Sequence, residues 1–100
     1  MVAVNDEMPD EPVELPIDGT LDLHAFSPAE TRALVADYLD LCRERGILVV
    51  RIIHGKGIGV QREIVHAVLR QHSAVRHFGH PSDGGGWGAT VVELWPREEV

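Results

Sequence analysis

Asp22 and His24 are the side chains with the clearest catalytic potential. They lie within residues 20–24, where polar and apolar residues alternate and predict a short strand. Side chains two positions apart on a strand share a face, so this carboxylate and this imidazole can act together. A neighbouring carboxylate orients an imidazole and raises its basicity, as general base catalysis requires. The alternative interpretation makes Asp22 a turn or capping residue and His24 an ordinary strand-end histidine.

A glycine-rich segment, residues 54–59, is suited to binding an anion. Its glycines are Gly55, Gly57 and Gly59, and the cations in and just after it are Lys56 and Arg62. Glycine lets the backbone approach a ligand closely, and the helix predicted to follow offers free N–H groups and a favourable dipole. We expect phosphate contact here, with His54 as an acid opposite His24 or as a further phosphate contact. The alternative is a tight turn that binds nothing, and the spacing matches neither a Walker A loop nor a dinucleotide fingerprint.

A second glycine-rich segment, residues 84–86, has Gly85 at its centre and Trp87 directly after it. The indole of Trp87 is suited to stacking on a base, as aromatic side chains do in proteins that bind single strands. The alternative is that it covers the end of the sheet. The remaining histidines receive structural interpretations, with His66 on the exterior of its helix, and no zinc site is assigned because no cysteine joins them.

The elements that must position these residues follow from periodicity and capping. Ser27, Pro28 and Glu30 form a helix start with a capping box, and Gly46 ends that helix. Its expected buried stripe is Leu34, Val35, Tyr38, Leu41 and Cys42. Residues 47–53 predict a strand buried on most of both faces, residues 60–71 a second helix, and residues 75–79 and 89–94 two more strands.

The predicted order is β-α-β-α-β-β, which indicates an α/β fold. Helical crossovers make the first three strands parallel, and the short last connection makes the fourth antiparallel. Two helices cover one face of a mixed four-stranded sheet, giving a two-layer sandwich. The segments that carry Asp22, His54 and Gly85 then meet at one edge, where α/β sheets commonly bind ligands.

Composition and charge set the class of protein. The chain has 100 residues, 44% of them hydrophobic, and no apolar run long enough for a membrane helix. Its single cysteine and an N-terminus without a signal peptide suit the cytoplasm. The net charge of −7 comes from an acidic leader, residues 1–18, and a tail, residues 97–100, because the folded part between them, residues 19–96, carries almost no net charge. That distribution permits a local basic groove.

Three segments together resemble the Smr (small MutS-related) domain family. They are Leu21-Asp22-Leu23-His24, Ile52-Ile53-His54-Gly55-Lys56-Gly57 and Gly84-Gly85-Gly86-Trp87-Gly88-Ala89-Thr90 with the strand that follows. The resemblance covers about residues 19–94. It implies a fold similar to the C-terminal domain of translation initiation factor 3.

The resemblance also implies binding and nicking of DNA or RNA, in a context of DNA repair, recombination or RNA quality control. Asp22, His24 and His54 would be catalytic, and residues 55–57 would bind phosphate. Cleavage of RNA would use the 2′-hydroxyl without a metal, whereas cleavage of DNA would use water, with Asp22 as a ligand of Mg²⁺ or Mn²⁺. The alternative function is a nucleic-acid- or ribosome-binding module without cleavage activity.

Overall fold

The computed structural model describes residues 16–55, 59–81 and 88–97. Along the chain the elements are β1 (Thr20–Asp22), α1 (Pro28–Glu44), β2 (Val49–Ile53), α2 (Val60–Gln71), β3 (Val75–Gly79) and β4 (Ala89–Leu94). The strands form one sheet in the order β1-β2-β4-β3. β1 and β2 are parallel, and β4 runs antiparallel to both of its neighbours. The predicted α/β fold with a mixed four-stranded sheet is confirmed.

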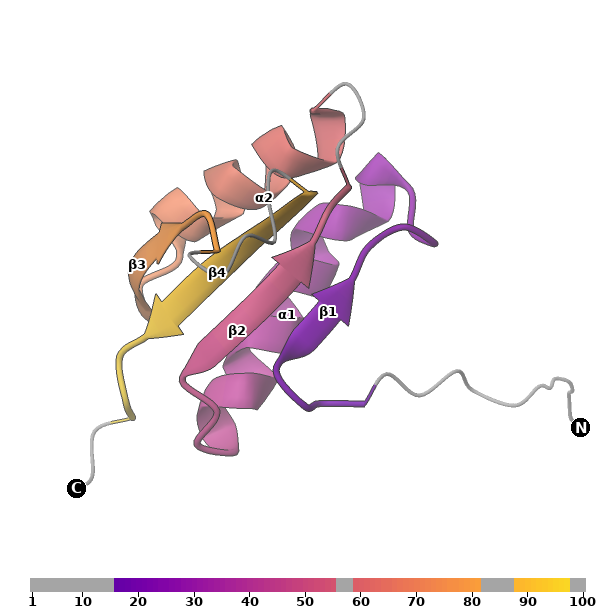
Figure 1. The fold of residues 1–100 in the computed structure, drawn as a ribbon. Helices are drawn as coiled ribbons and strands as arrows, with labels where there is room; N and C mark the ends of the chain where they lie inside the picture. The colour runs from indigo at the N-terminus through magenta and orange to yellow at the C-terminus, as the bar shows by residue number, and fades with distance from the viewer. Residues whose placement is uncertain (1–15, 56–58, 82–87, 98–100) are drawn as a thin grey trace, which may run out of the picture.

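Both helices pack on the same face of the sheet, and no helix among the described residues covers the opposite face (Figure 1). Strand β2 shows the consequence, because Val50 and Ile52 are fully buried whereas Val49 is 62% exposed. The prediction that residues 47–53 are buried on most of both faces is therefore wrong, and the strand begins at Val49. The physical reason is that only side chains pointing toward the helix layer find apolar partners.

Helix α1 begins and ends where its sequence predicts. The Glu30 carboxylate accepts the N–H of Ser27 at 3.0 Å, and Gly46 after the last turn has a φ of +78°. The expected buried stripe is partly wrong, because Leu39 is fully buried and Leu41 is 40% exposed. Leu39 lies one helical turn from other buried positions, so it continues the inward face.

A buried hydroxyl on α1 fixes the start of strand β1. The Tyr38 hydroxyl accepts the N–H of Gly19 at 3.1 Å and donates to the carbonyl of Thr20 at 3.0 Å. Strand β1 has three residues and lies at the edge of the sheet, so a neighbouring strand pairs with its backbone on one side only. The two hydrogen bonds with Tyr38 therefore help to hold the start of β1 in place. Within the described ranges, neither helix has the length and apolar character needed to cross a membrane.

Candidate functional site

Backbone hydrogen bonds bring the ends of β1 and β2 and the start of β4 to one edge of the sheet (Figure 1). The N–H of Leu23 donates to the carbonyl of Ile53 at 2.9 Å, and the N–H groups of His54 and Gly55 both donate to the carbonyl of Gly88 at 2.9 Å. The predicted convergence therefore holds for the described residues that flank the glycine segments. Four predicted contact residues lie outside the described residues: Lys56, Gly57, Gly85 and Trp87.

Asp22 and His24 form a hydrogen-bonded pair on the outside of this edge. The Oδ1 atom of Asp22 accepts the backbone N–H of His24 at 3.0 Å and lies 3.0 Å from the Nδ1 atom of the ring. A carboxylate only accepts, so Nδ1 carries a proton, and in the neutral ring Nε2 is then the nitrogen with the lone pair. Hydrogen bonds from the backbone and then the ring of His24 lower the pKa of Asp22. With the His24 side chain 82% exposed, the pair presents an oriented imidazole base to solvent.

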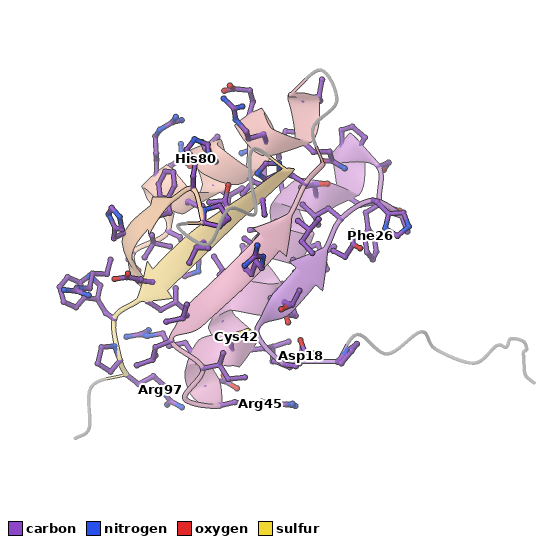
Figure 2. All side chains as sticks on the ribbon, viewed as in Figure 1. Asp18, Phe26, Cys42, Arg45, His80 and Arg97 are labelled. Carbon is purple, nitrogen blue, oxygen red and sulfur yellow. The ribbon has the colours of Figure 1, made fainter. Side chains whose placement is uncertain are left out.

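Gln61 links the turn that carries His24 to the first turn of α2. Its Nε2 donates to the carbonyl of Phe26 at 2.8 Å, and its Oε1 accepts the hydroxyl of Thr31 on α1 at 2.7 Å. Figure 2 shows Phe26 in the turn that follows β1, with Cys42 and Arg45 toward the opposite end of α1. One side chain thus holds together the turn after β1, the start of α1 and the start of α2.

Replacing Gln61 with alanine is expected to lower the free energy of unfolding by about 1–3 kcal/mol, because its hydrogen bonds to the Phe26 carbonyl and to the buried Thr31 hydroxyl are both lost. Urea denaturation measures this change. The matched control is Gln71→Ala in the exposed last turn of the same helix, with an expected change of about 0.5 kcal/mol or less. Equal losses in both variants would contradict a bridging role for Gln61.

His54 continues the inward alternation of Val50 and Ile52, so its ring lies inside the fold, only 7% exposed. Its Nε2 lies 2.9 Å from the hydroxyl of Thr90, and its Nδ1 lies 3.0 Å from the carbonyl of Gly55. Both ring nitrogens therefore have partners within the protein. This geometry differs from the direct contact with phosphate or leaving group that the sequence suggests, and it favours a positioning role.

His66 lies against the sheet, and the prediction that it faces the exterior of its helix is wrong. Its Nε2 is 3.0 Å from the Thr90 hydroxyl, and its ring lies against Phe78 with centroids 5.0 Å apart. Position 66 is three residues before the buried Leu69, so it borders the apolar stripe. That spacing could have predicted an inward position for His66. For Thr90, the sequence shows only that it lies on a strand.

Acidification below about pH 6.5 is expected to destabilise the fold. Burial lowers the pKa of both His54 and His66 from the ordinary value of 6.5. The unfolded chain then binds protons that the folded chain does not, so the free energy of unfolding decreases as pH falls. Urea denaturation between pH 7.5 and 5.5 measures the slope. His66→Phe removes one titrating group and should make the slope shallower, and an unchanged slope would contradict this assignment.

The described glycines of the first loop have the backbone conformation that glycine favours. Gly55 and Gly59 have φ angles of +83° and +91°, and Gly59 is the N-cap of α2 without a capping side chain. In the first turn of this helix, the Nε of Arg62 is buried and has no hydrogen-bond partner among the described residues. The positive charge of a guanidinium and the N-terminus of a helix both attract anions.

Asp22 is the one predicted metal ligand, and its surroundings do not form a metal centre of their own. No group of three potential metal-ligating side chains occurs among the described residues. The Oδ1 atom of Asp22 already accepts two N–H groups. A magnesium ion here would depend on ligands from a bound substrate, as is common for this metal.

Comparison with known proteins identifies the family. The model of the Smr domain matches residues 21–95. Endonuclease MutS2 of Brevibacillus brevis is 40% identical over 75 residues, which are 74% of this chain and 10% of that protein, so the chain spans about a tenth of the length of such relatives. The Smr domain of Thermus thermophilus MutS2 superimposes with a TM-score of 0.72 at 35% identity, covering 79% of this chain and all of the other. YdaL, a stand-alone small MutS-related protein from Escherichia coli, gives 0.69 at 28%, covering 76% and 63%. The chain belongs to the Smr domain family.

Proposed function

We propose that the chain binds nucleic acid at the edge formed by β1, β2 and α2 and cleaves a phosphodiester bond there. The observation that carries this proposal is the exposed His24 imidazole, whose Nδ1 is held 3.0 Å from Oδ1 of Asp22. Relatives named endonuclease MutS2 contain the same domain, which supports a nucleolytic role. The sequence adds the cation Lys56 directly after Gly55.

The chemistry assigned to His24 is removal of a proton from the attacking oxygen. On RNA that oxygen is the neighbouring 2′-hydroxyl, which attacks phosphorus. The bond from phosphorus to the 5′-oxygen breaks and that oxygen takes a proton from water, giving a 2′,3′-cyclic phosphate and a 5′-hydroxyl. On DNA the attacking oxygen belongs to water, and the product ends are a phosphate and a hydroxyl. Free N–H groups at the start of α2 are suited to stabilising the charge that develops on the phosphate oxygens.

Supercoiled plasmid and structured RNA, each incubated with Mg²⁺, with Mn²⁺ and with chelator, test the proposed cleavage. Products are separated by gel and their ends identified by sensitivity to phosphatase and to acid, which opens cyclic phosphates. Cleavage in chelator with cyclic phosphate ends supports the RNA route, and nicking that needs Mg²⁺ or Mn²⁺ supports hydrolysis with metal held by Asp22 and substrate. Binding without any product would overturn the nuclease and leave a binding module.

Arg62 is expected to contact a phosphate group. Replacing it with glutamine should weaken binding of a single-stranded oligonucleotide and reduce the slope of log affinity against log salt by about 1. Arg70→Gln, at an exposed position near the other end of the same helix, serves as the matched control. A titration by fluorescence anisotropy at several salt concentrations gives both slopes, and equal slopes for Arg62→Gln and the wild type would contradict the contact.

A further inference from the structure

A single buried hydroxyl lies between two histidines in the interior of the fold. Thr90 on β4 is 1% exposed, and its Oγ1 is 2.9 Å from Nε2 of His54 and 3.0 Å from Nε2 of His66. The two rings meet edge to face with centroids 6.2 Å apart. Because a hydroxyl has only one proton, it donates to one ring and accepts from the other.

The backbone decides the direction of this hydrogen-bond chain. The carbonyl of Gly55 accepts only, so the Nδ1 of His54, 3.0 Å away, carries the ring proton. The Nε2 of a neutral His54 is then an acceptor, and the Thr90 hydroxyl donates to it. The oxygen of Thr90 in turn accepts the Nε2–H of His66. All three side chains thus have one defined protonation pattern.

We propose that Thr90 and His66 are positioning residues that hold the ring of His54. Because that ring bonds to the Gly55 carbonyl, they also fix the backbone of Gly55 in the glycine-rich segment, residues 54–59, which is proposed to bind phosphate. This inference rests on the proposed function and names further residues of the same site. Gly55 has a φ of +83°, and its N–H already donates to the carbonyl of Gly88. Its own carbonyl is therefore the group through which the hydrogen bonds of Thr90 and His54 hold the Gly55 backbone.

Burial is the main cause that keeps both rings neutral, and nearby positive charges add to it. Burial, then His54, Arg62 and Arg70 lower the pKa of His66, while Glu63 raises it. Burial, then Arg62 and His80 lower the pKa of His54, while its hydrogen bond to the Gly55 carbonyl raises it. A proton added to Nε2 of His54 would point two N–H donors at the Thr90 oxygen and leave its hydroxyl proton without an acceptor. Together with burial, this explains why the neutral pattern is favoured at pH 7.

Imidazole ¹⁵N shifts measured by NMR on the full chain at pH 7.5 test the pattern without any need for activity. The expected result is the Nδ1–H tautomer for His54 and the Nε2–H tautomer for His66. Thr90→Val should leave the proton of His54 on Nδ1 but change the ¹⁵N shift of its Nε2, since this buried acceptor loses its donor, and should weaken binding of a single-stranded oligonucleotide about tenfold. Thr90→Ser should restore both readouts, and Thr20→Val on the exposed side of β1 is the matched control that changes neither.

The Nε2–H tautomer at His54 in the wild type would overturn the proposal, as would an unchanged ¹⁵N shift of His54 Nε2 in Thr90→Val. If Thr90→Val does not fold, His66→Gln and His66→Leu decide: glutamine keeps an N–H donor and should preserve the wild-type Nε2 shift of His54, whereas leucine should change it. An unchanged Nε2 shift in both variants overturns the role of His66. A wild-type chain that binds no nucleic acid but shows both tautomers would refute the proposed function and the loop's part in it, while confirming the hydrogen-bond chain itself.

Discussion

Replacing His24 with alanine is expected to lower the rate of phosphodiester cleavage by about 10²–10⁴-fold, the usual contribution of a positioned general base. Binding of the same substrate should remain, because the helix N-terminus, the glycine backbone and Arg62 are unchanged. Single-turnover cleavage with enzyme in excess measures the chemical step, and anisotropy measures binding. A loss of binding equal to the loss of rate would make His24 a contact residue and not a base.

The role of Asp22 is distinguished from that of His24 by the double variant. Asp22 is expected to act through the imidazole, since its Oδ1 lies 3.0 Å from Nδ1 of His24. Asp22→Ala should therefore slow cleavage, but Asp22→Ala combined with His24→Ala should be no slower than His24→Ala alone. Additive losses would indicate an independent task for Asp22, such as holding a metal ion with the substrate.

The protein contains its own control for this experiment. His72 and Asp40 form a second histidine–aspartate pair, also at 3.0 Å, which joins the C-terminal end of α2 to α1. A helix of 12 residues separates this pair from the Gly59 end by about 18 Å. His72→Ala is expected to leave cleavage unchanged, so a comparable loss there would point to a general effect of destabilisation or to a contaminating nuclease.

The sequence predicts the parts of the site that depend on local patterns. Alternation placed Asp22 and His24 on one face, capping residues placed the start of α1, and the order of elements placed the glycine segments at one edge. Each of these signals lies within a few neighbouring residues, or follows from the handedness of crossover connections.

The residues that the sequence did not place depend on which face of the sheet the helices cover. His54 points inward because it continues the alternation of β2 on the side that the helices cover. His66 contacts it because α2 packs on the sheet with the His66 side of the helix turned toward β4. Gln61 likewise bonds to Phe26 and Thr31 through the packing of α2 against α1. The two contacts of Gln61 join positions 35 and 30 residues apart, which no local periodicity encodes.

Leu23→Ala is expected to be the most destabilising of the substitutions considered, with a loss of about 2–5 kcal/mol in the free energy of unfolding. Leu23 is fully buried between Asp22 and His24, and its N–H binds the carbonyl of Ile53, so its side chain anchors the strand end that presents the pair. A domain of this size has a total stability of about 5–15 kcal/mol, so the variant should unfold at markedly lower urea.

The same chemical change at Leu41, which is 40% exposed on α1, provides the matched control and should cost about 1 kcal/mol or less. Urea denaturation gives both values, and cleavage assayed where Leu23→Ala remains folded gives the effect on the site. The cavity that Leu23→Ala leaves lies next to Asp22 and His24 in the chain. The cleavage rate should therefore fall in Leu23→Ala even under conditions where it is folded, while Leu41→Ala should cleave as the wild type does. Equal stabilities of the two variants would mean that the strand end is held by its backbone bond alone, and that the orientation of His24 does not depend on the core.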